Sequence, residues 1–226
     1  MLPLYDETPH RRTPVVVLLI IGACAVVMSF EFYLWKGHSE ASLNQFVHDW
    51  GLVPARMRPG VAPEAWWTVL TSMFLHGGWG HLAGNCWFLW LFGNNIEDRL
   101  GHVRFIVFYL AAGLAAAAAQ FLFAPNSAIA MVGASGAISG ILGAYLRYFP
   151  KSIIITLTPV WFAPLLPIPA FVFILIWFGF QIWNGIGEVT FPQLSGGIAW
   201  WAHIGGFLAG FALARPLAPK KRRTSS

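Results

Sequence analysis

Two serines in the stretch MVGASGAISG (residues 131–140) are the first candidates for chemistry. Ser135 has Gly133 and Gly136 close by, so little side chain surrounds it and backbone can approach its hydroxyl. A helix that begins near Ser135 would also point free backbone N–H groups at the same spot. Ser139 follows one helical turn later, where a serine commonly bonds the carbonyl four residues earlier. We therefore expect Ser135 to be a nucleophile and Ser139 to be a packing residue.

The stretch AHIGGFLAG supplies a candidate base, His203. A serine hydroxyl is a weak nucleophile until a neighbouring base takes its proton, and imidazole suits that role near neutral pH. Gly206 and Gly210 form a small-xxx-small pair that lets two helices in a membrane pack backbone to backbone. Gly140 and Gly143 offer a matching surface on the serine helix. The pattern predicts that His203 faces that helix.

The stretch HGGWGHLAGN adds His76, His81 and Asn85. His81 and Asn85 are four residues apart and share a face of a helix, where both can donate hydrogen bonds to an oxyanion. A metal site built from His76, His81 and His203 is an alternative, although HExxH is absent. The simplest alternative is that each histidine bonds a backbone carbonyl.

The composition indicates a membrane protein. Of the 226 residues, 57% are hydrophobic and only 10% are charged, against about a quarter in a typical soluble domain. The twelve Trp and nineteen Phe residues suit interfacial belts and tight intramembrane packing. Cys24 and Cys86 lie in apolar runs, which indicates buried thiols rather than a disulfide framework.

Six apolar stretches predict six helices. Three are long enough to span a bilayer at about 20 residues per crossing: Val15–Trp35, Val103–Phe123 and Trp200–Ala218. Three are shorter and should start or stop at depth: His81–Ile96, Ser135–Tyr148 and Ala170–Asn184. Four prolines, the last of them Pro169, exclude a regular helix before the fifth stretch, and Gly185–Gly197 is expected to be a flexible lid.

The basic residues predict the orientation. With a cytoplasmic N-terminus and six crossings, only Lys36, Arg56 and Arg58 fall outside. Eleven of the fourteen Lys and Arg residues fall inside, as the positive-inside rule requires: Arg11, Arg12, Arg99, Arg104, Arg147, Lys151, Arg215, Lys220, Lys221, Arg222 and Arg223. The basic tail accounts for most of the net charge of +5, so a nucleic-acid partner is not needed to explain it.

The first apolar run has a competing interpretation as a cleaved signal. It contains IGAC and ACA, which resemble processing sites, after Arg11 and Arg12. The run continues apolar through Trp35 and no polar domain follows, so we expect it to remain as a membrane span.

As a set, these motifs resemble those of the rhomboid family, the six-helix intramembrane serine proteases. GASG matches the GxSG of the family, HGGWGHLAGN matches its histidine and asparagine cluster, and AHIGGFLAG matches AHxxGxxxG. The resemblance covers residues 15–218 and implies an all-α, six-transmembrane-helix bundle. It also implies that Gly37–Leu75 is a long first loop lying partly in the membrane.

The resemblance assigns roles to single residues. It implies that Ser135 and His203 form a catalytic dyad without an aspartate. It implies that His81, Asn85 and the backbone N–H of Ser135 form the oxyanion hole. Supporting roles are implied for His76, Gly133, Gly136, Gly206, Gly210, Glu97 and Trp67, with Glu97 tying helix ends together. No cofactor and no metal are implied.

Two positions depart from the family pattern. The first loop of rhomboids often carries Trp-Arg, whereas Thr68 follows Trp67 here and cannot supply the donors of a guanidinium. Some members place an aromatic residue one turn after the nucleophile to stack on the base, whereas this chain has Ser139. The sequence therefore leaves open how the first loop is anchored and how His203 is oriented.

We expect an intramembrane serine endopeptidase that cleaves transmembrane helices of other membrane proteins. The expected organisation is a cytoplasmic segment at residues 1–14, a membrane domain at 15–218 and a basic cytoplasmic tail at 219–226. The expected location is the bacterial inner membrane with both termini in the cytoplasm. A non-proteolytic relative that binds membrane clients is the alternative, and a transporter fits less well because the helix cores contain almost no charges.

Overall fold

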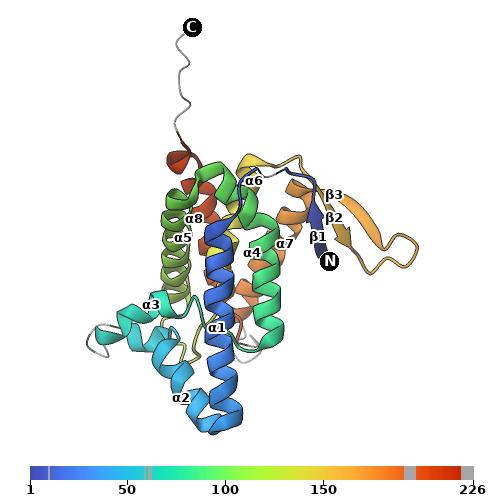
Figure 1. Cartoon of the computed structure of the whole chain (residues 1–226). Helices are drawn as coiled ribbons and strands as arrows, with labels where there is room; N and C mark the ends of the chain where they lie inside the picture. Colours follow the sequence, from blue (N-terminus) through green and yellow to red (C-terminus); the bar gives the residue numbers. More distant parts are fainter. Residues whose placement is uncertain (10, 59, 61–62, 191–196, 220–226) are drawn as a thin grey trace.

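The computed structural model describes the chain except residues 10, 59, 61–62, 191–196 and 220–226. Within the described residues, six helices have fourteen or more residues: α1 (Val15–Gly37), α4 (Trp79–Leu100), α5 (His102–Phe123), α6 (Ser135–Tyr148), α7 (Ala170–Thr190) and α8 (Trp200–Leu217). Figure 1 shows them side by side as a bundle. Each occupies one of the predicted apolar stretches.

Two of the stretches predicted to be short form long helices. α4 has 22 residues and α7 has 21, because both continue well beyond their most apolar part. The expectation of a lid over Gly185–Gly197 is therefore wrong for residues 185–190, which continue α7, and residues 191–196 lie outside the described part.

Among the described residues, three helices are long and apolar enough to cross a membrane, namely α1, α5 and α7. The sequence predicts the last stretch, Trp200–Ala218, in this group instead of α7. α8 is less apolar than expected because its 18 residues include His203, Arg215 and Pro216. α6, with 14 residues, is as short as predicted.

The chain is mostly helical but not all-α, because it contains a three-stranded antiparallel sheet that the sequence analysis missed. β2 (Ile153–Leu157) lies between β1 (Leu2–Asp6) and β3 (Leu165–Pro169). The central strand is rich in β-branched residues and lacks proline. Pro3, Pro167 and Pro169 lie on the two edge strands, where a missing N–H is tolerated.

The sheet anchors the N-terminal segment to the bundle. Tyr145 of α6 donates a hydrogen bond to Asp6, and Asn95 of α4 donates another to the same carboxylate at 2.9 Å. Thr8 also lies 2.8 Å from the Tyr145 hydroxyl. The N-terminal segment is therefore held against α4 and α6, and Figure 1 shows β1 running beside α4.

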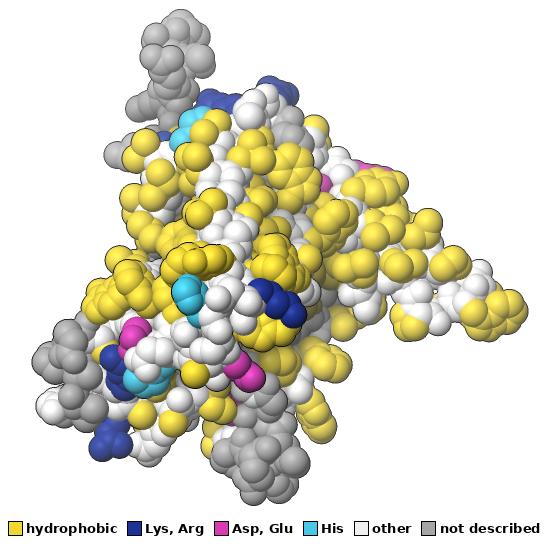
Figure 2. All heavy atoms as spheres, turned by 60° about the horizontal axis from the view of Figure 1, so that its bottom comes forward, with side chains coloured by type: hydrophobic (Ala, Val, Ile, Leu, Met, Phe, Trp, Pro, Cys, Tyr) yellow, Lys and Arg dark blue, Asp and Glu magenta, His cyan; other side chains and the backbone are white. Residues whose placement is uncertain are grey.

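The surface of the bundle is apolar. Exposed side chains include Leu19 and Val26 of α1, Leu122 of α5 and Trp183 of α7, each at least 66% exposed. Figure 2 shows this apolar surface continuing over the β2–β3 hairpin, whereas charged side chains are few on this face and several of them gather at the end that carries α2. Such a surface suits lipid rather than water.

Between α1 and α4 the chain forms short elements at the end of the bundle opposite the sheet (Figure 1). They are α2 (Glu40–Trp50), the 3-10 turns η1 (Pro54–Met57) and η2 (Pro63–Trp67), and α3 (Thr68–Thr71). The inner face of these elements is buried through Leu52, Met57 and Val69, which pack against Ala117 of α5.

Candidate active site

Ser135 and His203 meet between α6 and α8. Ser135 is the first residue of α6, and His203 lies in the first turn of α8. Although 68 positions separate them, Ser135 Oγ lies 2.8 Å from His203 Nε2. This geometry is that of a serine hydroxyl bonded to a base.

Glycines bring the two helices into this contact. A Cβ on Gly206 would collide with the carbonyl oxygen of Gly136, and a Cβ on Gly143 would collide with that of Phe207. The predicted backbone-to-backbone packing of the two helices is confirmed. Gly136 itself faces Ala116 of α5 and Ala202 of α8, so its small size serves helix packing rather than access to the hydroxyl.

Ser139 is buried below Ser135 and has a partner. Its Oγ donates to the carbonyl oxygen of Ser135 at 2.7 Å, which is the i−4 bond predicted from the sequence. The side chain is 1% exposed.

Two donors converge on the space beside Ser135. The Asn85 Nδ2 atom is buried and has no hydrogen-bond partner among the described residues. The His81 Nδ1 atom accepts a bond from Gly77 N at 3.3 Å, which leaves the proton of a neutral ring on Nε2. A Cβ built on Gly133 would lie 2.9 Å from that Nε2 atom and 3.2 Å from Asn85 Nδ2. Both donors therefore point at the backbone just before Ser135.

Gly133 adopts a backbone conformation that other residues rarely take. Its φ is +116°, and its N–H donates to the carbonyl oxygen of Ser72 at 2.8 Å. This bond fixes the segment that leads into α6. The absence of a side chain keeps the space in front of Asn85 open.

These residues line a pocket of about 640 Å³. Its wall includes His81, Asn85, Ser135 and His203, together with Trp177 and Gln181 of α7. The pocket is mostly apolar with a few convergent polar groups, as is typical of sites for organic ligands.

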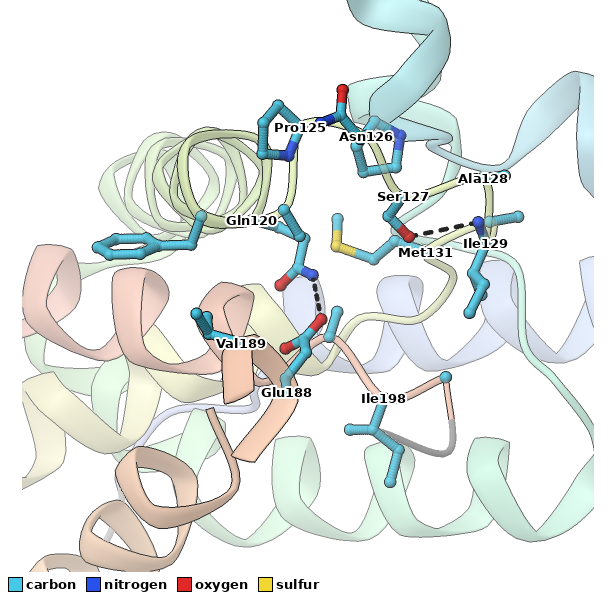
Figure 3. A pocket seen from close by; sticks show the side chains of 16 residues that line it. Gln120, Pro125, Asn126, Ser127, Ala128, Ile129, Met131, Glu188, Val189 and Ile198 are labelled. Atoms are coloured by element: carbon cyan, nitrogen blue, oxygen red, sulfur yellow. Dashed lines mark hydrogen bonds between the residues drawn. The ribbon is translucent and has the colours of Figure 1, made fainter. Parts of the chain in front are cut away.

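A second pocket of about 420 Å³ adjoins the first and shares Ala130, Met131 and residues 197–199 with it. In Figure 3, Gln120 and Glu188 point toward each other across this pocket, and Gln120 Nε2 donates to Glu188 Oε1 at 2.9 Å. Gln120 Oε1 accepts from the backbone N–H of Ala202 at 3.1 Å. Gln120 thus caps the start of α8 directly before His203.

His76 lies outside the pocket wall and is held by α1. Its backbone N–H donates to the buried carboxylate of Glu31, and its Nδ1 lies 3.1 Å from the carbonyl oxygen of Phe74. In the part of the chain that the structure describes, no three His, Cys, Asp or Glu side chains are grouped closely enough to hold a metal ion. His76 and His81 lie edge to face with ring centroids 5.2 Å apart, but His203 does not complete such a group with them.

The first loop is anchored by backbone bonds. Leu52 and Met131 exchange two backbone hydrogen bonds of 3.1 and 2.7 Å, and Ala55 N donates to Ser127 O at 3.0 Å. Thr68 is buried and donates to Ala65 O at 2.6 Å, within its own segment. Trp67 packs edge-on against Trp50 at 4.6 Å. The loop is therefore joined to the segment before α6 without a guanidinium at position 68.

Glu97 lies at the far end of the bundle from Ser135. Its buried carboxylate accepts from Val16 N at 2.9 Å and from Val17 N at 2.8 Å, at the start of α1. His102 Nδ1 also lies 2.6 Å from it. The carboxylate thus joins α1, α4 and α5.

The sequence analysis missed Gln120 and Gln181. Both are buried, at 4% and 5% exposure, and Gln181 Oε1 lies 2.8 Å from His203 Nδ1. The sequence does mark both residues as candidates for a functional role. Each is a polar residue inside a stretch predicted to be a membrane helix, where polar groups are costly.

Comparison with known proteins identifies the class to which this fold and site belong. The rhomboid domain model matches residues 63–220, well over half of the chain, so the chain belongs to the rhomboid family of membrane proteins.

Three bacterial relatives are similar in sequence. The rhomboid protease GluP of Bacillus subtilis (strain 168) is 45% identical over 86 residues, 38% of this chain and 16% of GluP. YdcA, a rhomboid-family protein of the same organism, is 38% identical over 140 residues, 62% of this chain and 65% of YdcA. The rhomboid protease AarA of Providencia stuartii is 30% identical over 179 residues, 71% of this chain and 60% of AarA. The matched part is in each case less than two thirds of the relative's length.

Proposed function

We propose that this protein is an intramembrane serine endopeptidase that cleaves transmembrane segments of other membrane proteins. The observation that carries the proposal is the 2.8 Å contact between Ser135 Oγ and His203 Nε2, inside a pocket lined by helices with an apolar outer surface. The similarity to GluP and AarA, which are named as rhomboid proteases, supports the same activity.

In the proposed reaction, His203 Nε2 takes the proton of Ser135 Oγ while the oxygen attacks the carbonyl carbon of the scissile peptide. The tetrahedral intermediate then collapses, the C–N bond breaks, and the imidazolium gives its proton to the leaving amine. Water, activated by the same imidazole, hydrolyses the ester on Ser135 and regenerates the hydroxyl.

We assign the oxyanion hole to Asn85, His81 and the backbone N–H of Ser135. The buried, unpartnered Nδ2 of Asn85 supports this role, because an orphan donor beside a nucleophile is ready to receive a developing negative charge. The geometry of His81 supports a neutral ring that offers Nε2–H to the same point. Gly133 keeps the approach open.

We propose that six helices cross or enter the bilayer with both termini in the cytoplasm of a bacterium. The start of α1 lies beside the end of α4, where Glu97 bonds Val16, and the basic residues predicted to be inside cluster in sequence around these ends. The elements between α1 and α4 expose Trp50 and Trp66, which supports a first loop that rests in the outer interface.

A client-binding relative without protease activity is the competing class. Such a protein has no need for a serine bonded to an imidazole, so the contact between Ser135 and His203 favours the enzyme.

The test is cleavage of a panel of single-span substrates in proteoliposomes. The proposal predicts a cut within or next to the membrane segment, and loss of that cut in Ser135→Ala and His203→Ala variants that stay folded. Cleavage that persists in Ser135→Ala would overturn it.

A further inference from the structure

The orientation of His203 is not explained by any acidic residue. The side-chain partners of its ring in the described structure are Ser135 at Nε2 and Gln181 at Nδ1, each at 2.8 Å. A serine–histidine pair needs its imidazole in one tautomer, and in triad enzymes a carboxylate imposes it. Among the described residues, the group placed to do so is the amide of Gln181.

A second hydrogen bond fixes which end of that amide faces the ring. Gln181 Nε2 donates to the carbonyl oxygen of Trp177, one turn earlier on α7, at 3.1 Å. A carbonyl oxygen can only accept, so the nitrogen of the amide must point at Trp177 and the oxygen at His203. The acceptor that His203 meets is therefore Gln181 Oε1.

This acceptor fixes the proton on the imidazole. Because an amide oxygen cannot donate, the bond at Nδ1 requires an N–H there. A neutral ring with its proton on Nδ1 presents a lone pair at Nε2, which is what Ser135 Oγ–H needs from a base. The donor and acceptor of each hydrogen bond in this series are therefore fixed. The Gln181 amide donates to Trp177 O, His203 Nδ1–H donates to Gln181 Oε1, and Ser135 Oγ–H donates to His203 Nε2.

The packing of α7 on α8 holds Gln181 in register with the ring. Phe178 stacks on Phe207 of α8 with ring centroids 4.2 Å apart. Trp177 and Trp200 flank the imidazole at 6.3 and 6.1 Å between centroids. Gln181 is 5% exposed, so water competes little for its bond.

We infer that Gln181 is the positioning residue that sets the tautomer and orientation of His203. This inference rests on the proposed function. A neutral amide provides the acceptor without placing a buried negative charge in an apolar bundle, which would be costly.

The experiment measures kcat and KM for one cleaved single-span substrate in proteoliposomes. Gln181→Met keeps the length of the side chain but has no acceptor, and Gln181→Asn keeps the amide but cannot reach Nδ1. Both should lower kcat about tenfold to a hundredfold with KM little changed, because a buried N–H is left unpaired in the step that charges the ring.

The matched control is Asn184→Met on the same helix. Asn184 Nδ2 donates to Phe180 O at 2.7 Å, the same kind of local bond, and its replacement should leave kcat unchanged. Thermal unfolding of every variant identifies any that is misfolded. If Gln181→Met is misfolded, the test rests on Gln181→Asn.

The inference is overturned if Gln181→Met and Gln181→Asn turn over at the wild-type rate. In that case Ser135→Ala would still be inactive, so the proposed function would stand. If the wild-type protein cleaves no substrate, or Ser135→Ala cleaves as well as the wild type, the proposed function fails and this inference fails with it.

Discussion

Gly210 of α8 lies directly against Gly140 of α6, so closely that a Cβ on Gly210 would collide with the carbonyl oxygen of Gly140. This contact lies one turn beyond the corresponding contact between Gly206 and Gly136. The two helices that carry His203 and Ser135 are thus held at backbone distance by residues without side chains. The distance between Ser135 and His203 depends on these glycines.

Gly210→Ala should therefore reduce both stability and activity. The added methyl must push α8 away from rigid backbone, and overpacking of this kind costs about 1–3 kcal/mol. The measurement is the thermal midpoint in detergent together with the cleavage rate. Gly179→Ala on α7 is the control, since a Cβ there meets nothing within 4 Å and alanine favours the helix. Equal midpoints for the two variants would contradict the packing account.

Asn85→Ala should reduce turnover much more than substrate binding. Removal of one oxyanion donor typically lowers kcat by about a hundredfold to a thousandfold. The Nδ2 atom of Asn85 has no partner among the residues that the structure describes, so the substitution breaks none of the bonds seen there and the fold should survive. Steady-state kinetics with one substrate measures the effect. An unchanged kcat in Asn85→Ala, and in the double variant with His81→Ala, would remove both residues from the oxyanion hole.

Glu97→Ala should destabilise the protein without a specific effect on the chemistry. The substitution leaves Val16 N and Val17 N buried without an acceptor, which costs about 1–3 kcal/mol for each unsatisfied group. Asp98→Ala is the natural comparison, because its carboxylate bonds Arg11 N and Arg12 N in an exposed position. Thermal unfolding should show a clearly larger loss for Glu97→Ala, and a larger loss for Asp98→Ala would contradict the role of Glu97.

The expected depth of Ser135 in the bilayer predicts from which side of the membrane a reagent can reach it. α6 has 14 residues and rises roughly 20 Å, whereas the hydrocarbon core is about 30 Å thick. If α6 ends at the cytoplasmic face, Ser135 lies about 10 Å below the outer surface and needs a water-filled opening for hydrolysis. A Ser135→Cys protein, with Cys24 and Cys86 replaced, should react with a membrane-impermeant thiol reagent added from the outside. Reaction only from the cytoplasmic side would contradict the proposed topology.

The helices were predictable because apolar runs and glycine spacing act locally. The sequence placed α1, α5 and α6 within a few residues, and Gly206 and Gly210 indicated where α8 packs. The sheet was not predictable in the same way. Both edge strands contain prolines, and β1 is joined to β2 by pairing between Leu2 and Leu157, so that pairing depends on residues far apart in the chain.

Gln181 shows which part of the candidate site could not be predicted from the sequence. Its sequence position, 22 residues before His203, carries no information about contact, because the bond forms only when α7 packs on α8. The rule that polar residues in membrane helices are functional candidates would have selected it, as it would have selected Gln120. Their partners could be identified only once the helices were placed.

The most direct test of the central claim is covalent labelling of the purified protein with a serine-directed fluorophosphonate, followed by mass mapping of the modified peptide. The account predicts one adduct on Ser135, undiminished in Ser139→Ala and lost in His203→Ala, because the hydroxyl reacts only when His203 takes its proton. An adduct on Ser139 or on another residue, or labelling of Ser135 that is as fast in His203→Ala as in the wild type, would contradict it.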